Sequence, residues 1–442
     1  MPTKAVPRPA ATQPSLPEVH STVALSRSSH SWRRLLGFMG PGFLIAVGYM
    51  DPGNWATDIA GGSRFGYTLL FVVMASNLMA VLLQSLSLKL GVATERDLAQ
   101  LCHEEYGPKV SFALWIFAEI AIAACDLAEV VGSAIALELL FHIPLFYGVL
   151  ITGLDVLLIL LLQRWGFRYI EALVIALIGT IITLFGVQVF FSHPDYGLAW
   201  RALFVPSSAI VADPAMLYIA IGILGATVMP HNLYLHSSIV QSRRYLRTSD
   251  GKREAIRMAN IDSALALTIA LFVNAAILIV AAAVFHRSGH FDVAAIQDAY
   301  KLLSPLVGAA GASTLFAIAL LASGQNSSIT GTLAGQVVME GFVNIRVAPW
   351  LRRLITRSLA IIPTIIVVAI TGESGTEKLL ILSQVILSLQ LSFAVFPLVL
   401  FTGNRARMGQ FVNARWLQAL SWCVAILIAV FNAWLLIQTV RA

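Results

Sequence analysis

Asp51-Pro52-Gly53-Asn54 interrupts an apolar segment, residues 44–57, that is otherwise suited to the interior of a membrane. A carboxylate at that depth costs at least about 3 kcal/mol, so its presence indicates a function. Pro and Gly beside it break the helix and leave backbone carbonyls without helical hydrogen bonds. Irregular backbone is tolerated in a membrane only where protein or a water-filled cavity surrounds it. The stretch therefore predicts a broken membrane helix with a polar centre.

A second break of the same form lies far along the chain, at Met229-Pro230-His231-Asn232. Both stretches read X-Pro-X-Asn, and the first position of each carries a side chain that can bind a metal ion. Two broken helices in corresponding positions are the best sequence indication of the central site of a transporter.

The composition excludes a soluble domain. Of the 442 residues, 58% are hydrophobic and only 12% are charged, whereas a soluble domain carries roughly 25% charged residues. The three cysteines, Cys102, Cys125 and Cys423, show no disulfide or zinc spacing. Residues 1–35 are rich in Pro, Ser, Thr and Arg and lack a continuous apolar core, which predicts a disordered cytosolic tail.

Apolar runs long enough to cross a bilayer predict eleven transmembrane helices. The predicted spans cover residues 36–57, 67–90, 110–140, 144–163, 168–192, 214–241, 260–285, 305–334, 354–371, 377–402 and 412–438.

The distribution of Lys and Arg orients these spans. With a cytosolic N-terminus, all but six of the 29 basic residues fall in cytosolic segments. The six in outer segments are Arg64, Arg201, Arg287, Lys301, Lys378 and Arg441. One wrong span would reverse the side of every later loop, so the bias supports the full set. We therefore predict a multi-pass protein of the cell membrane with a cytosolic N-terminus and an external C-terminus.

The first and sixth spans lie five apart and therefore cross the membrane in opposite directions, as an inverted repeat of five helices requires. This relation predicts a first repeat over residues 36–192, a second over 214–402, and an additional eleventh helix with the C-terminus over 412–442. The predicted fold class is an all-α polytopic membrane protein with eleven transmembrane helices, an inverted five-helix repeat and broken helices 1 and 6.

The two breaks predict a metal site of mixed ligands. Asp51 and Asn54 offer oxygen ligands, and an unwound carbonyl near Gly48 adds another. Met229 offers a thioether, with the carbonyl of Ala226 one turn earlier. Oxygen with one soft sulfur suits Mn²⁺ or Fe²⁺ and disfavours the alkaline-earth ions. A methionine alone is more often a gap-filler between helices, but the matching place before a Pro break favours a ligand.

Polar residues in later spans are candidates to complete this site. Gln384 and Gln390 have no evident structural need, and either a contact with the central ion or a helix–helix hydrogen bond explains them. The run 323–332 in the eighth span is too polar and too small for a lipid-facing helix, which indicates close helix contact. The outer segment 286–304 is compatible with a short amphipathic helix on the membrane surface and equally with an ordinary loop.

Three carboxylates lie on one stripe of the third span, at spacings of seven and three: Glu119, Asp126 and Glu129. Such residues inside a span usually serve ion or proton transfer, although solvation near the interface is the alternative for Glu119. His231 and His236 are candidate proton carriers because the ordinary pKa of histidine is near neutrality. A structural histidine is the alternative for each.

Two further groups belong to the predicted proton pathway. Asp51 takes part because it cannot easily hold a proton and a divalent cation together. The arginines at the inner end of the ninth span are candidate partners for the third-span carboxylates, or else ordinary topology determinants. These arginines are Arg352, Arg353 and Arg357.

The chain resembles the Nramp family of proton-coupled divalent metal transporters, in particular its bacterial manganese-importing members, over residues 36–440. The motifs are Asp51-Pro52-Gly53-Asn54, Met229-Pro230-His231-Asn232, and the run from Gly324-Gln325 through Gly331-Thr332-Leu333-Ala334-Gly335-Gln336 to Met339-Glu340-Gly341. The resemblance implies the fold of the sodium-coupled amino-acid transporters with an eleventh helix added.

The resemblance also implies roles for single residues. The metal ligands would be Asp51, Asn54, Met229 and the Ala226 carbonyl, with Gln384 joining in some states. The proton route would include Glu129, Asp126, His231 and Arg357. Gly48 stands where relatives often have Ala, and its carbonyl can still coordinate.

The leading hypothesis is a secondary active symporter, not an enzyme, that imports Mn²⁺ and Fe²⁺ with protons by alternating access. It needs no cofactor and acts as a monomer, with the metal ion, protons and the lipid bilayer as its partners. A sodium-coupled amino-acid or amine transporter is the first alternative, and it would favour a neutral break of small residues.

Other classes fit the sequence less well. A metal channel needs no pair of broken helices. An intramembrane metalloenzyme would need metal-ligand spacing and a nucleophile or base pair that the sequence lacks. No GxxxxGK[ST] loop is present, so a nucleotide does not power transport, and nothing indicates a nucleic-acid partner.

Overall fold

The computed structural model describes residues 13–17, 19–25, 31–153, 166–293, 295–309, 311–371 and 374–441. Within these residues the regular structure is helical except for one short parallel pair, β1 (Val23–Ala24) and β2 (Arg243–Arg244). The helices of the first half are α1 (Ser31–Phe38), α2 (Pro41–Gly48), α3 (Pro52–Phe65), η1 (Gly66–Leu69), α4 (Leu70–Thr94), α5 (Leu98–Phe141), α6 (Leu145–Thr152), α8 (Phe167–Ser192), α9 (Tyr196–Phe204) and α10 (Ala209–Ala212).

The second half begins with another pair of short helices, as the first half does with α2 and α3. Its helices are α11 (Pro214–Thr227), α12 (Pro230–Ile239), η2 (Val240–Ser242), α13 (Ser249–Ala281), η3 (Ala282–His286), α14 (Ile296–Val307), α15 (Ala312–Val343), α16 (Pro349–Thr371), α17 (Ser374–Gly403), α18 (Arg405–Met408), η4 (Gly409–Phe411) and α19 (Arg415–Arg441).

Seven helical units among the described residues are long and apolar enough to cross a membrane. They are Pro52–Thr94, Leu98–Phe141, Phe167–Ser192, Pro214–Ser242, Ser249–His286, Gly375–Gly403 and Arg415–Gln438. The prediction of an all-α polytopic membrane protein is therefore confirmed. Further predicted spans correspond to α15, which carries the polar run 323–332, and to α16. The fourth predicted span begins with α6, and its continuation lies outside the described residues.

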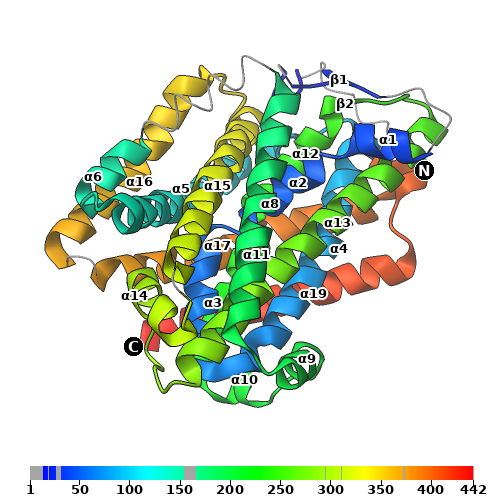
Figure 1. The fold of residues 1–442 in the computed structure, drawn as a ribbon. Helices are drawn as coiled ribbons and strands as arrows, with labels where there is room; N and C mark the ends of the chain where they lie inside the picture. Colours follow the sequence, from blue (N-terminus) through cyan, green and yellow to red (C-terminus); the bar gives the residue numbers. More distant parts are fainter. Residues whose placement is uncertain are drawn as a thin grey trace.

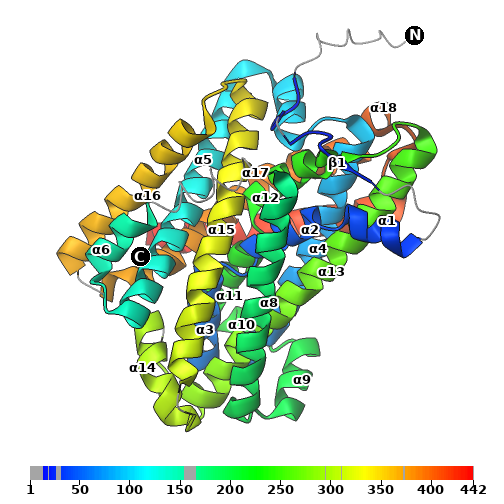
Figure 2. The ribbon, with the colours of Figure 1, turned by 45° about the horizontal axis from the view of Figure 1, so that its top comes forward.

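The segments that connect the long helices lie at two opposite ends of the molecule. Figure 1 shows α1 and the β pair at one end and α9, α10 and α14 at the other. Between these ends α5 and α15 pack along much of their length. The helices α6 and α16 lie side by side against α5, as Figure 2 shows.

Both breaks fall where the sequence predicts them. A proline occupies the first turn of α3 and of α12, the position where its missing N–H costs no hydrogen bond. Beyond the first break, Trp55 packs edge-on against Phe185 of α8 and Phe316 of α15, with ring centroids 4.8 and 5.2 Å apart. This contact fixes the direction in which α3 leaves the break.

Part of the predicted disordered tail is packed against the helix ends, and here the structure differs from the sequence prediction. Leu16 is buried, and its N–H donates to a carboxylate oxygen of Glu340 at 3.1 Å. Val23 is also buried and pairs with Arg243 in the β ladder. This segment is packed because its few apolar residues are buried against distant parts of the chain, and the sequence alone does not show which parts those are.

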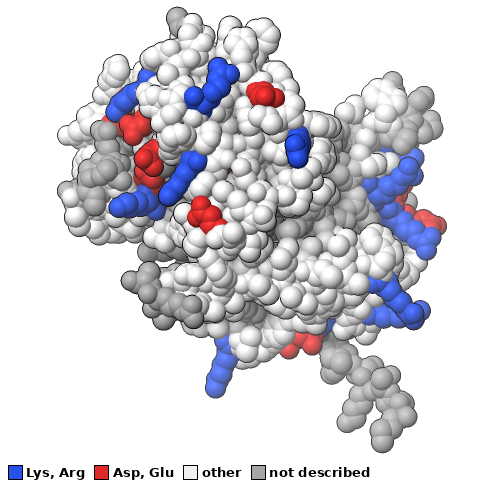
Figure 3. All heavy atoms as spheres, turned by 90° about the horizontal axis from the view of Figure 1, so that it is seen from below, with Lys and Arg blue, Asp and Glu red and all other residues white. Residues whose placement is uncertain are grey.

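The outer segment 286–304 is neither wholly helix nor wholly loop. It contains the start of α14, whose residues Ile296, Ala299 and Leu303 are buried while Asp298 and Lys301 are exposed. The amphipathic helix is thus present but begins ten residues later than the segment does. Figure 3 views the face that holds α14, where charged side chains lie in small groups separated by uncharged surface.

Candidate functional site

At the first break, side chains form hydrogen bonds to the backbone carbonyls that have lost their helical partners. Helix α2 ends at Gly48, and the freed carbonyl of Tyr49 accepts a hydrogen bond from the Asn274 amide at 2.8 Å. The Met50 carbonyl accepts from the Trp55 indole at 3.2 Å and also from the Ser323 hydroxyl. Because α13 and α15 supply two of these three donors and α3 supplies the third, the break is a built feature and not a local distortion.

Asp51 begins α3 as its N-cap. One carboxylate oxygen, Oδ1, accepts from the Asn54 backbone N–H at 2.8 Å and from the Asn54 side-chain amide at 2.7 Å. The other oxygen, Oδ2, has no hydrogen-bond partner among the described residues. The carboxylate is fully buried, so it presents one uncommitted oxygen to the centre of the molecule.

The second break faces the first, and Asn54 joins the two. The Asn54 amide nitrogen donates to the Ala226 carbonyl at 3.1 Å and lies 3.4 Å from the Gly48 carbonyl. Met229 stands at the N-cap of α12 with no side-chain capping bond. The Asn232 amide lies 3.7 Å from the Met229 sulfur. The structure thus brings Asp51 and the carbonyls of Gly48 and Ala226 together around Asn54. The Met229 sulfur reaches the first break at Gly48, where it would lie 3.0 Å from an added Cβ atom.

Helix α17 brings Gln384 to the same place. A Cβ atom added to Gly53 would overlap the side-chain amide of Gln384, so this glycine is required for the approach. Gln384 is fully buried, and its Oε1 has no partner among the described residues. The Asn232 side-chain oxygen is also buried and has no partner among the described residues. Buried polar atoms are almost always paired, so this concentration of unpaired oxygens fits a cation that is held there transiently.

The donor set has the chemistry of a substrate site for a divalent transition metal. Among the described residues no three His, Cys, Asp or Glu side chains meet in a way that could hold a metal. The breaks offer one carboxylate, amide and backbone oxygens, and one thioether. A single negative charge with neutral ligands binds more weakly than a structural zinc site does, and a transported ion must also leave.

A hydrogen-bonded chain lies on the side of the breaks from which α12 leads to β2. The Gln84 amide donates to the Tyr49 hydroxyl at 2.8 Å, and its oxygen lies 2.9 Å from Nδ1 of His236. His231 is also buried, but neither of its ring nitrogens has a hydrogen-bond partner among the described residues. Of the two predicted proton carriers, His236 therefore belongs to this network, and His231 stands apart from it.

The start of α2 is fastened to the helices around it. Arg243 forms a salt bridge of 2.8 Å with Glu171, both nearly fully buried, and also donates to the carbonyls of Phe38 and Met39. The Asp262 carboxylate accepts from the backbone N–H of Gly42 at 2.7 Å. Removing one partner of such a buried pair costs about 3–5 kcal/mol, so these contacts hold α2 firmly in this state.

The predicted third-span stripe lies along α5 as expected, with different surroundings for its members. Asp126 and Glu129 are buried, and a Cβ atom on Gly331 of α15 would lie 3.1 Å from the Asp126 carboxylate and 3.3 Å from that of Glu129. Cys125 lies 3.6 Å from the Glu129 carboxylate. Glu119 is only partly buried and accepts from the Trp115 indole at 2.9 Å. The side chains of Arg352, Arg353 and Arg357 lie outside the described residues.

Sequence reasoning missed several polar residues of this centre. Asp58 is buried two turns beyond Asp51, and the seven-residue spacing was a readable signal. Asn274 and the Tyr49–Gln84 pair gave no such signal, because their roles depend on which helices touch.

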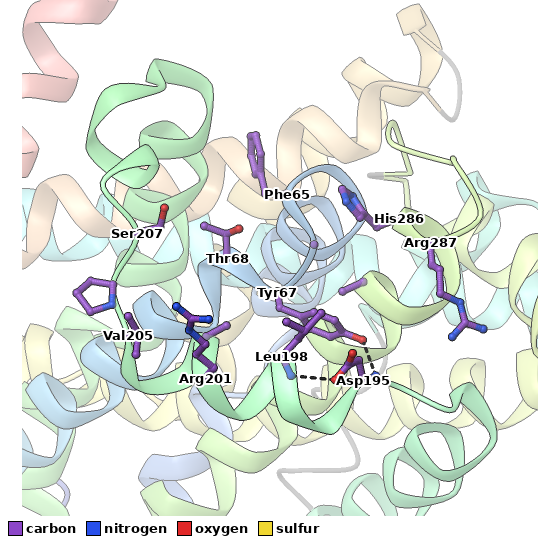
Figure 4. Close-up of a pocket in the computed structure, with 14 residues that line it drawn as sticks. Phe65, Tyr67, Thr68, Asp195, Leu198, Arg201, Val205, Ser207, His286 and Arg287 are labelled. Atoms are coloured by element: carbon purple, nitrogen blue, oxygen red, sulfur yellow. Dashed lines mark hydrogen bonds between the residues drawn. The ribbon is translucent and has the colours of Figure 1, made fainter.

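A large pocket of about 740 Å³, lined in part by α9, is separate from the breaks and shares no residue with them. Figure 4 shows Tyr67, Asp195 and Leu198 together in its wall, with Arg201 on one side and His286 and Arg287 on the other. The Asp195 N–H donates to the Tyr67 hydroxyl at 3.2 Å. With two arginines against one carboxylate, the lining does not suit a cation.

Comparisons with known proteins agree with this geometry. A family model described as natural resistance-associated macrophage protein-like (Nramp) matches residues 42–438. The chain is 62% identical over 431 residues to a divalent metal cation transporter MntH of Nostoc, covering 98% of this chain and 97% of that protein. It is 61% identical over 433 residues to a protein of the same name from Listeria welshimeri, covering 98% and 96%.

Solved structures show the same fold. The manganese transporter of Eremococcus coleocola, in complex with an aromatic bis-isothiourea substituted compound, is 45% identical with a TM-score of 0.89, covering 95% of this chain and 90% of that one. MhsT in complex with L-phenylalanine is 16% identical with a TM-score of 0.59, covering 88% and 98%. At that identity the second likeness speaks for the fold alone, and it agrees with the predicted inverted repeat.

Proposed function

Because the chain belongs to the Nramp family, we propose that it imports divalent transition-metal ions, Mn²⁺ and Fe²⁺, together with protons across the cell membrane. The observation that carries the proposal is the Asn54 amide, which bonds both to Asp51 and to the Ala226 carbonyl of the opposite break. An ion that replaces the amide nitrogen, with the Asn54 side chain turned so that its oxygen faces the ion, touches both broken helices and therefore senses any movement of one against the other.

The ligand set gives selectivity as well as binding. Asp51 supplies the negative charge that offsets much of the cost of removing water from a divalent ion. The amide and carbonyl oxygens of Asn54, Gln384 and Ala226 replace further water molecules. The Met229 sulfur adds a soft donor, which alkaline-earth ions bind poorly and transition metals accept.

Transport needs access to this site from each side in turn. In the present state, the contacts of Arg243 and Asp262 with the start of α2 and the chain Tyr49–Gln84–His236 oppose opening towards β2. Opening on that side moves the start of α2 away from β2 and α13, which breaks the contacts of Arg243 and Asp262. It also moves α2 and α12 away from α4, which breaks the chain through Gln84. Closing the outer side at the same time is the alternating-access cycle that broken-helix transporters use.

Proton movement is assigned to residues next to the metal site. Asp51 cannot easily hold a proton and a divalent cation together, so the incoming metal displaces or redirects the proton. Asp126 and Glu129 lie on one face of α5 and pass it on, with His231 and His236 tuning the transfer from the second break. The predicted roles of Arg352, Arg353 and Arg357 as partners on the exit side belong to the same proposal.

The orientation and the functional unit are also proposed. The charge bias of the loops supports a cytosolic N-terminus and an external C-terminus in the cell membrane. The complete set of candidate ligands comes from one chain, which supports a monomer as the functional unit.

Reconstitution tests the function. Purified protein in liposomes that contain a metal-sensitive dye and a pH dye should show saturable Mn²⁺ uptake together with internal acidification. Asp51→Ala should abolish both signals. The matched control is Asp195→Asn, a carboxylate of the outer pocket outside the proposed site, which should transport as the wild type does. Saturable uptake by Asp51→Ala with near-normal affinity would place the site elsewhere.

A further inference from the structure

Asp58 is a buried carboxylate that the proposed transport site does not use. It is 1% exposed and lies in the middle of α3. Seven residues separate it from Asp51 and four from Asn54, so all three lie on one stripe of the helix. A carboxylate inside a transmembrane helix is a functional residue by default.

The contacts of α3 show which helix Asp58 faces. One turn below it, the Asn54 side-chain oxygen lies 3.4 Å from the Asn274 amide of α13. One turn above it, a Cβ atom on Gly62 would lie 2.5 Å from the Leu278 carbonyl of the same helix. Residues 54, 58 and 62 are spaced by four, so Asp58 lies on the stripe that faces α13, between Asn274 and Leu278.

Asp58 lacks a protein partner there. Its Oδ2 has no hydrogen-bond partner among the described residues. Among the same residues, Asp58 forms no salt bridge. Arg64, the basic residue at the end of the same helix, instead lies over the Phe65 ring at 5.5 Å. A buried carboxylate without a counter-charge is costly, so a visiting cation would relieve it.

Two other buried oxygens near Asn54 are unpaired in the same way. The Asn274 amide nitrogen is used by Tyr49 and Asn54, but its oxygen has no partner among the described residues. The Thr227 hydroxyl follows Ala226, whose carbonyl accepts from Asn54, and it too has no described partner. Each of the helices α3, α11 and α13 thus carries one unpaired buried oxygen close in the chain to Asn54 or to a residue that Asn54 contacts.

We propose that Asp58, with the side-chain oxygens of Asn274 and Thr227, forms an outer station that holds a partly hydrated divalent cation before it reaches Asp51. The inference rests on the proposed function. All the ligands of this station are oxygens, so it concentrates divalent cations without distinguishing among them. Selection follows at the inner site, where the Met229 sulfur is available.

The station makes a kinetic prediction that separates it from the inner site. Asp58→Asn keeps the shape of the side chain and removes the charge that attracts the ion. The KM for Mn²⁺ and that for Cd²⁺ should both rise, by about tenfold, while the maximal rate and the Mn²⁺-to-Cd²⁺ preference stay as in the wild type. Asp58→Glu should restore most of the affinity because it restores the charge.

The matched control is Ser63→Ala, on the same helix, whose hydroxyl donates to the backbone carbonyls of Ala60 and Val293. It should leave both KM values unchanged, and the melting temperature of each detergent-purified variant shows that it is folded. An unchanged KM in Asp58→Asn would overturn the station. So would a variant that loses proton flux with normal metal affinity, because that result assigns Asp58 to protons. If the wild type carries no divalent metal, the proposed function itself fails.

Discussion

Met229 contributes the one sulfur atom among the candidate metal ligands, and its surroundings suit that role. It is fully buried in a small cluster with Ala124, Cys125 and Leu387, apart from the main hydrophobic core. Its sulfur lies 3.7 Å from the Asn232 amide of its own helix and would lie 3.0 Å from a Cβ atom on Gly48, so the side chain reaches the first break.

Replacing Met229 with Ala should change selectivity more than strength. The remaining ligands are oxygens, which distinguish poorly between Mn²⁺ and Ca²⁺. Uptake of Mn²⁺ should fall moderately, by less than about tenfold, whereas millimolar Ca²⁺ should begin to compete. Met216→Ala, a buried methionine of α11 in another cluster, is the control. Competition assays in which Met229→Ala still rejects Ca²⁺ as the wild type does would contradict this role.

The sequence was sufficient to identify the polar residues of the two breaks, but not the residues of other helices that contact them. Asp51, Asn54 and Met229 are marked by the shared X-Pro-X-Asn pattern, which is local. Asn274 is not marked, because it acts only through the Tyr49 carbonyl that α2 leaves free. Contacts of this kind depend on which helices touch, and no local pattern encodes them.

Glycines in and beside the helix breaks let another helix approach them closely. Gln384 of α17 occupies the space where a side chain on Gly53 would lie. Similarly, a Cβ atom on Gly225 of α11 would overlap the backbone carbonyl of Gln384. These two glycines set the distance between α17 and both breaks.

Gly53→Ala should therefore abolish most transport while leaving a folded protein. The added methyl group displaces the Gln384 amide, which removes that oxygen from the site. The matched control is Gly179→Ala, in the middle of α8, where a Cβ atom meets nothing within 4 Å and Ala is the better helix former. Uptake assays and melting temperatures on both variants make the comparison. Normal Mn²⁺ uptake by a folded Gly53→Ala variant would show that Gln384 is not needed.

Helix α5 carries the proposed proton route as one stripe. Glu129→Gln and Asp126→Asn should lose metal-driven internal acidification while keeping part of the metal uptake. Glu119→Gln is the control from the same stripe, because this side chain is only partly buried and already pairs with Trp115. Both fluxes are measured in one preparation with two dyes. Equal losses of proton and metal flux in every variant would remove the case for a separate proton route.

The elements show where sequence patterns reach their limit. Apolar length was enough to predict the long helices, and Pro was enough to place the starts of α3 and α12. The amphipathic outer helix was harder, because α14 begins at Ile296, well inside the predicted segment. The spacing of the apolar residues in this segment is compatible with a helix or a loop. In the structure it forms a helix, whose residues Ile296 and Leu303 are buried.

In the molecule as a whole, the segments that connect the long helices lie at two opposite ends. The end with β2 also holds α1, and the other end holds α9 and α14 (Figure 1). The first of these ends carries the basic segment around Arg243, Arg244 and Arg247, which the charge bias assigns to the cytosol. With the eleven spans that the sequence predicts, we expect the two termini on opposite sides of the membrane.

Reporter fusions test this orientation. Alkaline phosphatase joined after Ala442 should be active, because it folds only outside the cytosol, and green fluorescent protein at the same place should stay dark. Fusions of the same two reporters after Gly403, one span earlier, should give the reverse result. If both fusion points report the same side, the predicted eleventh span does not cross the membrane.

The scale of the whole molecule is also where sequence reasoning was least complete. Residues 13–25 were predicted to belong to a disordered tail, yet Leu16 and Val23 are buried against distant parts of the chain. Their partners, Glu340 and Arg243, lie hundreds of residues away. Only the fold brings those surfaces to the N-terminal segment.

The central claim is that one divalent ion is held between the two helix breaks. Anomalous diffraction at the manganese edge, from crystals grown with Mn²⁺, tests it most directly. The account predicts that the strongest peak lies between the Asp51 carboxylate, the Asn54 side chain and the Met229 sulfur, and that it vanishes in Asp51→Asn crystals. A strongest peak elsewhere, unchanged by the Asp51 substitution, would contradict it.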